Sequence, residues 1–70
     1  MSVRELLRRL RACAHTKNAN FEVIKNRGKG GHQMVHFGDR KTTVPAPNKE
    51  LKLGTLKAIL KQLDIHDDEF

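Results

Sequence analysis

Two apolar stripes with helical spacing lie at opposite ends of this 70-residue chain, and they constrain its fold more than any other feature. Apolar residues that recur at three- and four-residue intervals predict amphipathic helices. A helix can bury such a stripe only against another element, so the segment between the two helices must supply a shared apolar surface. The first stripe comprises Val3, Leu6, Leu7, Leu10 and Cys13, and the second comprises Leu53, Leu56, Ile59, Leu60 and Leu63.

The segment between the predicted helices carries three short strand patterns. Phe21–Asn26, His32–Phe37 and Lys41–Pro45 are separated by turn-forming residues, which predicts antiparallel hairpins. Prolines 45 and 47 end the pattern, because proline has no N–H for a sheet ladder. The predicted fold class is α+β with the order α-β-β-β-α, a three-stranded antiparallel sheet with two helices packed on one face. Double-stranded-RNA-binding domains share this order.

The first helix has a clear start and two different faces. Ser2 followed by Glu5 is the S-x-x-E capping box. Arg4, Arg8 and Arg11 share the face opposite the apolar stripe, and we expect them to be solvated. The single cysteine, Cys13, belongs to the apolar stripe, and it excludes an internal disulfide and a cysteine-rich zinc site.

Length and charge suggest one domain with a short acidic tail. We assign residues 1–65 to the domain and 66–70 to the tail, which we expect to fray, with Ile65 and Phe70 as candidate anchors. The absence of disulfides fits a reducing cytoplasm, where we expect the protein to be located. No apolar run approaches the roughly 20 residues that span a bilayer, so no membrane partner is expected.

The charge of the chain is strongly uneven. Residues 1–63 hold all 14 basic residues and only four of the eight acidic ones, which gives that part a net charge of +10. A body this basic attracts phosphate polyanions, of which nucleic acid is the most common. A solubilising surface is the plainer alternative, and the size of the charge makes it the weaker one.

A glycine-rich segment with the letters GKGGHQ, residues 28–33, places His32 directly after three glycines in four positions. The residues alone leave three interpretations: a turn before a strand, a phosphate cradle, and a catalytic imidazole aimed at a polyanion. A glycine turn is ordinary because glycine supplies positive φ, and a lone histidine beside it is usually inert. Successive backbone N–H groups in such a turn could also hold a phosphate, together with Arg27 and Lys29.

Three ordered blocks of sequence resemble the HicA family of toxins, small mRNA interferases encoded beside HicB antitoxins. A Lys-Gly-small-His sequence spans Lys29–His32, a TVP-x-PNK-x-L crossover spans Thr43–Leu51, and the last helix carries GTL and AILKQL within Gly54–Leu63. The resemblance covers most of the chain. It departs at Gly31, where the family commonly has serine, and at Gln33, where a second histidine often follows the first.

The resemblance implies the toxin of a type II toxin–antitoxin system, an endoribonuclease that cleaves mRNA. His32 maps onto the histidine on which cleavage depends in the family. The implied partner is a HicB-type antitoxin that neutralises the toxin, with operator DNA bound only indirectly through the antitoxin complex. No cofactor and no metal ion are expected.

Elementary chemistry also favours His32. Cleaving RNA without a metal needs a base for the 2′-OH proton and an acid for the leaving 5′-oxygen, and imidazole, with a reference pKa of about 6.5, can serve as either. We expect the scissile phosphate to be held by two groups of residues. The first is the loop itself, and the second is the segment before the last helix, whose N-terminus also attracts phosphate. These candidates are Arg27, Lys29, Gly30, Gly31, Lys49 and Lys52.

Other interpretations remain open at the level of the sequence. His36 could be a second acid or base or half of a metal pair, although two histidines make an incomplete metal site and a bystander role is favoured. A non-catalytic double-stranded-RNA-binding module would explain the charge and the fold without using His32. A protein-interaction adaptor with an acidic partner is a third hypothesis.

Overall fold

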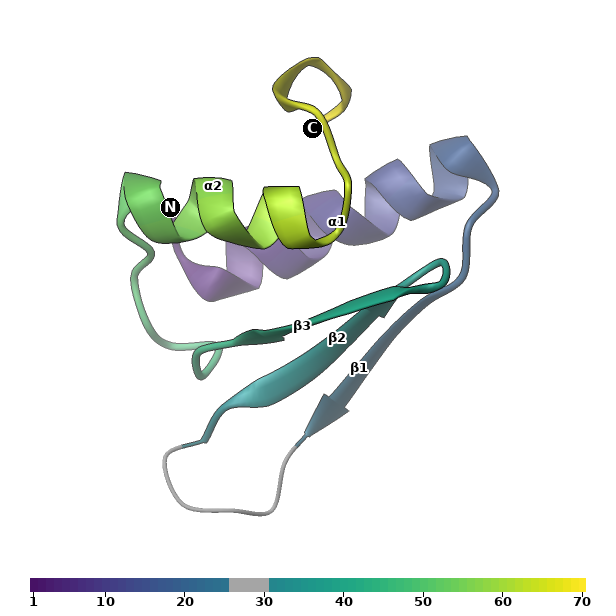
Figure 1. Ribbon diagram of the computed structural model, residues 1–70. Coiled ribbons are helices and arrows are strands. Elements are labelled where there is room, and N and C mark those ends of the chain that lie inside the picture. Colours follow the sequence, from purple (N-terminus) through teal and green to yellow (C-terminus); the bar gives the residue numbers. More distant parts are fainter. Residues whose placement is uncertain (26–30) are drawn as a thin grey trace.

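Two helices pack on one face of a three-stranded sheet (Figure 1), in a computed structural model that describes residues 1–25 and 31–70. The predicted α-β-β-β-α order is confirmed. Within the described ranges, no helix is long and apolar enough to cross a membrane. The elements are α1 (Val3–Lys17), β1 (Phe21–Lys25), β2 (Gln33–Phe37), β3 (Arg40–Val44), α2 (Leu53–Gln62) and a short 3₁₀ helix, η1 (Asp67–Glu69).

Local chemistry sets both ends of α1. Ser2 has an extended backbone, and its hydroxyl accepts a hydrogen bond from the N–H of Glu5 at 3.1 Å, as the sequence predicts. The Glu5 side chain turns to Arg8 and Arg9, and the hydrogen bond from Arg8 lowers the pKa of the Glu5 carboxyl. Asn18 ends the helix in the left-handed conformation, with φ of 55°.

The sheet is an antiparallel meander in the order β1-β2-β3. Gly38 has φ of +62° at the first position of the two-residue β2–β3 turn, the pattern of a type II′ hairpin. Three predicted boundaries are wrong by one residue. β2 begins after His32, β3 begins at Arg40 and not at Lys41, and β3 ends before Pro45, which lacks the N–H that a strand donates. Asn26, the predicted end of β1, lies outside the described residues.

The two faces of β2 have different environments. Gln33, Val35 and Phe37 point toward the helices and are buried, whereas Met34 and His36 lie on the open face and are partly exposed. Side chains alternate between the two faces of a strand, so this division follows the two-residue period of the sequence. The same alternation places one polar residue, Gln33, on the buried face.

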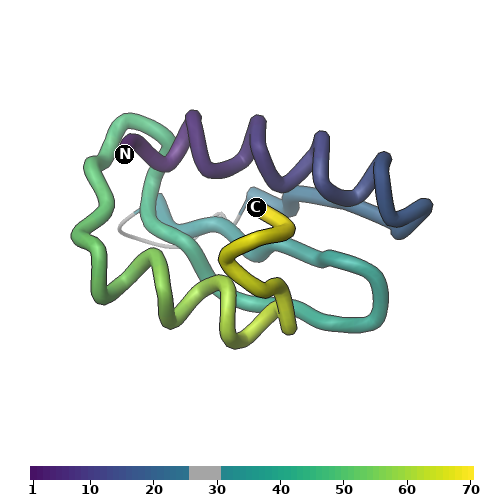
Figure 2. The backbone as a smooth tube through the Cα atoms, turned by 90° about the horizontal axis from the view of Figure 1, so that it is seen from above, coloured from purple at the N-terminus to yellow at the C-terminus, as the bar shows by residue number. Residues whose placement is uncertain are grey.

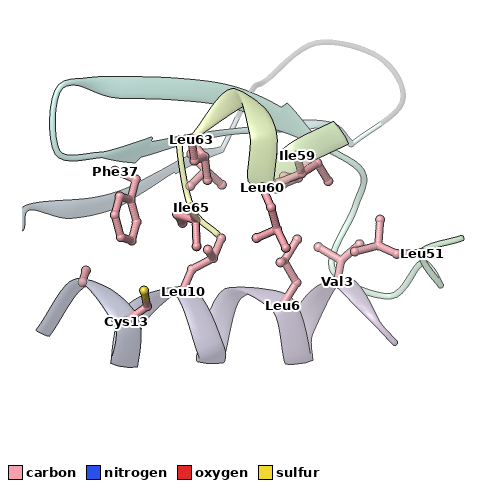
Figure 3. Packing of buried hydrophobic residues seen from close by; sticks show 13 residues of the cluster. Val3, Leu6, Leu10, Cys13, Phe37, Leu51, Ile59, Leu60, Leu63 and Ile65 are labelled. Carbon is pink, nitrogen blue, oxygen red and sulfur yellow. The ribbon is translucent and has the colours of Figure 1, made fainter. Parts of the chain in front are cut away.

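The core lies between the helices and the inner face of the sheet (Figure 3). α1 lies over the β1 side of the sheet and α2 over the β3 side (Figure 2). The second predicted stripe is wrong at Leu53, which is 67% exposed because it stands at the first position of α2, before the buried part of that helix. The buried apolar residues are Val3, Leu6, Leu10, Cys13, Ala14, Val35, Phe37, Val44, Leu51, Ile59, Leu60, Leu63 and Ile65.

The acidic tail is packed, not frayed as the sequence suggests. Ile65 is buried in the core, and the chain then turns back so that its C-terminus lies between α1 and α2 as seen from above (Figure 2). Glu69 forms an ion pair with Lys17 of α1, and the Arg9 guanidinium lies 5.6 Å from the centre of the Phe70 ring. The two predicted anchors, Ile65 and Phe70, therefore both contact the body of the protein.

Candidate catalytic and phosphate-binding site

His32 is exposed and lies directly before the first residue of β2. The following residue, Gln33, pairs with Lys25 of β1 on one side and Val44 of β3 on the other, so the chain is fixed in the sheet one residue after His32. The imidazole is thus accessible to a large substrate, while its backbone is attached to a rigid strand.

Gly31 connects His32 to a second part of the chain. Its φ is +68°, in the left-handed region that residues other than glycine rarely adopt. A Cβ at this position would stand 3.3 Å from the Cβ of Ala46, so the backbone of Gly31 lies against the β3–α2 crossover. Glycine at this position therefore allows both the turn and the close approach.

The crossover that Gly31 contacts is itself well anchored. Lys49 N–H donates to the carbonyl of Ala46 at 3.0 Å, closing a turn around Pro47 and Asn48. Lys49 C=O accepts from Val3 N–H at 2.9 Å, which attaches the turn to the start of α1. This turn brings the backbone of Lys49, and with it an exposed side chain, to the end of the molecule where Gly31 and His32 lie.

Lys52 stands at the start of α2, three residues beyond Lys49. It is the N-cap residue, its side chain makes no capping hydrogen bond, and the first turn of α2 contains no acidic residue. The partial positive charge of the helix N-terminus is therefore available to an anion. The nearest carboxylate in sequence, Glu50, forms an ion pair with the N-terminal ammonium of Met1.

Four of the seven residues that the sequence assigns to the site lie in the described part of the chain. Gly31, directly before His32, lies against Ala46, whose carbonyl accepts from the N–H of Lys49, and Lys52 stands three residues later at the start of α2. Arg27, Lys29 and Gly30, the other three, lie outside the described residues.

The sequence matches a known protein family over most of its length. The family model described as the HicA toxin of bacterial toxin–antitoxin systems matches residues 4–65, nearly the whole chain. The chain belongs to the HicA toxin family. Searches of curated proteins and of solved structures gave no significant match. Membership of a toxin–antitoxin family also implies an antitoxin as the partner of this HicA chain.

His36, the candidate partner of His32 in this HicA chain, lies four residues further along. His36 lies on the open face of the sheet, where its strand partners are Glu22 and Lys41. Among the described residues, no group of three histidine, cysteine or carboxylate side chains is placed to hold a metal ion.

The sequence did not lead us to predict that Gln33 of the HicA chain is buried. Its side chain is 3% exposed, and it lines a groove between α1 and β1. The alternation of the strand did predict this burial, because Gln33 lies on the same face of β2 as Val35 and Phe37. The polarity of glutamine, which usually favours exposure, obscured it.

Proposed function

We propose that this HicA-family protein is an endoribonuclease that cleaves mRNA with His32 as the catalytic residue and is neutralised by a HicB-type antitoxin. The observation that supports the proposal is the contact of Gly31, the residue before the exposed His32, with a basic crossover. His32 follows Gly31, which packs on Ala46, and the same turn carries Lys49. A phosphate held at this end would lie next to a group able to move protons.

The chemistry assigned to His32 is proton transfer at the scissile phosphodiester. Removal of the 2′-OH proton lets the 2′-oxygen attack phosphorus, and protonation of the 5′-oxygen lets that oxygen leave. The products are a 2′,3′-cyclic phosphate and a 5′-hydroxyl. Lys49, Lys52 and the N-terminus of α2 would offset the negative charge that develops on the phosphate oxygens.

Neutralisation by the antitoxin fits the distribution of charge. The first 63 residues carry a net charge of +10, so an acidic surface over the His32 end would associate quickly and exclude RNA. Operator DNA would then be contacted by the antitoxin within the complex. The expected cellular location of both proteins is the cytoplasm, where mRNA is the substrate.

The test is a cleavage assay with the purified chain and a structured mRNA fragment in the presence of a chelator. We expect cleavage that leaves 5′-hydroxyl ends and stops when the purified antitoxin is added. Cleavage that requires an added divalent ion would contradict the metal-free mechanism. RNA binding without any cleavage would favour the double-stranded-RNA-binding module, for which the basic crossover alone would suffice.

A further inference from the structure

A groove of about 510 Å³ separates the middle of α1 from the inner face of β1. Leu7 of α1, Val23 of β1 and Pro47 of the crossover form its apolar walls, and Phe21 of β1 also lines it. Leu7, Phe21 and Val23 are only partly buried because α1 does not cover this margin of the sheet. A volume of this size lies within the ~300–1,000 Å³ range of small-molecule sites.

One buried polar group lines this groove without a partner. Gln33 is 3% exposed, and its Nε2 has no hydrogen-bond partner among the described residues. Buried amide groups are nearly always hydrogen-bonded, because leaving one unpaired costs free energy. The natural occupant of the groove should therefore offer an acceptor to Gln33.

Three cationic side chains among the described residues line the same groove. Arg8 and Arg11 come from α1 and Lys25 from the end of β1, and all three are exposed. Arg8 is paired with Glu5 one turn earlier, whereas Arg11 lies over the Phe21 ring at 5.8 Å from its centre. None of the described residues that line the groove is a carboxylate, so its rim has the charge expected around phosphate.

We propose that the groove between α1 and β1 binds one nucleotide of single-stranded RNA, with the base between Leu7, Val23 and Pro47 and its edge hydrogen-bonded to Gln33. Arg11 and Lys25 then contact the phosphates on either side, and Arg8 extends the basic track along α1. Gln33 is a specificity residue in this arrangement. Many single-stranded RNA sites stack the base on an aromatic ring, but this chain has no tyrosine or tryptophan. In this groove, apolar walls and one hydrogen bond from an amide would hold the base.

The position of Gln33 in the chain connects this subsite with the proposed cleavage site. Its Cα is about 3.8 Å from that of His32, as in any pair of residues joined by a trans peptide. A base held by Gln33 therefore places its own phosphates near the His32 end of the sheet. The inference rests on the proposed function in this respect, although binding in the groove does not itself require cleavage.

RNA fits the groove better than a segment of an acidic protein does. A planar base with acceptor atoms on its edge satisfies the Gln33 amide and the apolar walls together, while its phosphates satisfy the cations outside. An acidic peptide would satisfy the cations, but its carboxylates do not suit the apolar interior.

Nuclear magnetic resonance of the intact ¹⁵N-labelled chain tests the contact directly. The chain has two glutamines, Gln33 and Gln62, and Gln62 is exposed on α2, so it serves as the internal control. The probes are four 2′-O-methyl tetranucleotides, one for each base, which cannot be cleaved because their 2′-oxygens are blocked. We expect the side-chain amide signal of Gln33 to shift with at least one base while that of Gln62 does not move.

Gln33→Leu tests specificity, with Gln62→Leu as the matched control. Removing an unpaired buried amide should leave Tm unchanged or raise it, so a loss of function is not a loss of fold. We expect Gln33→Leu to reduce the ratio of kcat/KM between the best and the worst base by about tenfold, and Gln62→Leu to leave it unchanged. The double variant Arg11→Gln with Lys25→Gln should weaken the binding of all four tetranucleotides alike. The double variant Lys57→Gln with Lys61→Gln, on α2, should leave their binding unchanged.

The outcomes separate this inference from the proposed function. A shift of the Gln33 amide in a protein that cleaves no RNA supports the groove and contradicts the nuclease. Cleavage with an unmoved Gln33 amide and an unchanged base preference in Gln33→Leu overturns the groove and leaves the nuclease standing. A Gln33 shift with a hexaglutamate peptide or the antitoxin, but with none of the tetranucleotides, overturns the RNA assignment in favour of a protein ligand.

Discussion

His32 and Gln33 are consecutive in the chain but occupy opposite environments. His32 is exposed before the first residue of β2, whereas the Gln33 side chain is 3% exposed and faces α1. Because β2 begins at Gln33, the Gln33 side chain lies on the inner face of the sheet and lines the groove, while His32 stays accessible. Chemistry and base selection can therefore be assigned to neighbouring residues and tested separately.

His32→Ala should reduce RNA cleavage by at least about 10²-fold, the usual contribution of a general acid or base. The fold should be preserved because the side chain is exposed, which circular dichroism and Tm would verify. RNA binding, measured with a 2′-O-methyl oligonucleotide, should change little.

His36→Ala is the matched control for this prediction. It removes an imidazole from the open face of the same strand, between Glu22 and Lys41. We expect it to cleave RNA at nearly the wild-type rate. Equal losses of activity in the two variants would contradict a special role for His32.

Gly31→Ala should destabilise the protein by about 1 to 2 kcal/mol, the cost of the left-handed conformation for a residue with a Cβ. The new Cβ would also stand 3.3 Å from the Cβ of Ala46, a tight contact that Ala46 would have to relieve by a small shift. For a domain of this size, each kcal/mol corresponds to a fall in Tm of about 4 to 8 °C. Gly31→Ser, which also adds a Cβ, should behave similarly.

Gly54→Ala provides the contrast in thermal unfolding. Gly54 lies in the first turn of α2, and a Cβ there meets nothing within 4 Å. Alanine favours the helix by up to about 1 kcal/mol over glycine, so Tm should rise. If Gly31→Ala also raised Tm, the turn before His32 would not have the conformation described above.

The elements of the fold were predictable because each one is encoded by a local pattern. The Ser2–Glu5 cap, the helical stripes and the alternation in β2 depend on spacings of two to four residues. The exposure of Leu53 was not predictable from its stripe, because spacing does not tell how far along its axis a helix is covered.

The features that the sequence did not predict depend on contacts between distant segments. Gly31 lies against Ala46, and the tail packs on α1 through Lys17 and Glu69. Neither contact leaves a periodic signal, and a tail rich in carboxylates suggests solvation. The groove around Gln33 was missed for the same reason, because it forms only where α1 and β1 diverge.

Lys49→Gln and Lys52→Gln should each weaken RNA binding about equally for all sequences. Each lost phosphate contact should reduce the slope of log K against log salt concentration by about 0.7 to 0.9. Binding of a 2′-O-methyl oligonucleotide at several salt concentrations measures this slope. Lys57→Gln and Lys61→Gln, on the exposed side of α2, should leave it unchanged.

The docked tail should be sensitive to pH through the pair of Lys17 and Glu69. The hydrogen bond from Lys17 lowers the pKa of the Glu69 carboxyl from its ordinary value of 4.5, and the same bond raises the pKa of the Lys17 ammonium above 10.5. A lowered carboxyl pKa stabilises docking above the ordinary value and loses that effect as the pH falls through the folded value. A raised ammonium pKa stabilises docking below 10.5 and loses that effect at higher pH. Docking should therefore be tightest between about pH 5 and pH 10.

Cys13 reports on the tail at a fixed pH, because its Sγ lies 3.6 Å from the carbonyl oxygen of Glu69 and the thiol is buried. Glu69→Gln should increase the rate at which a thiol reagent modifies Cys13 at pH 7.5 severalfold, since the tail then leaves α1 more often. Asp68→Asn, which removes a tail carboxylate outside the pair, is the matched control and should react at the wild-type rate. The amide signals of Ile65 to Phe70 should move toward those of an unfolded chain between pH 5 and pH 3 in the wild type, and Glu69→Gln should show a smaller change over that range. Equal modification rates in wild type and Glu69→Gln would mean that the apolar contacts of Ile65 and Phe70 hold the tail without the ion pair.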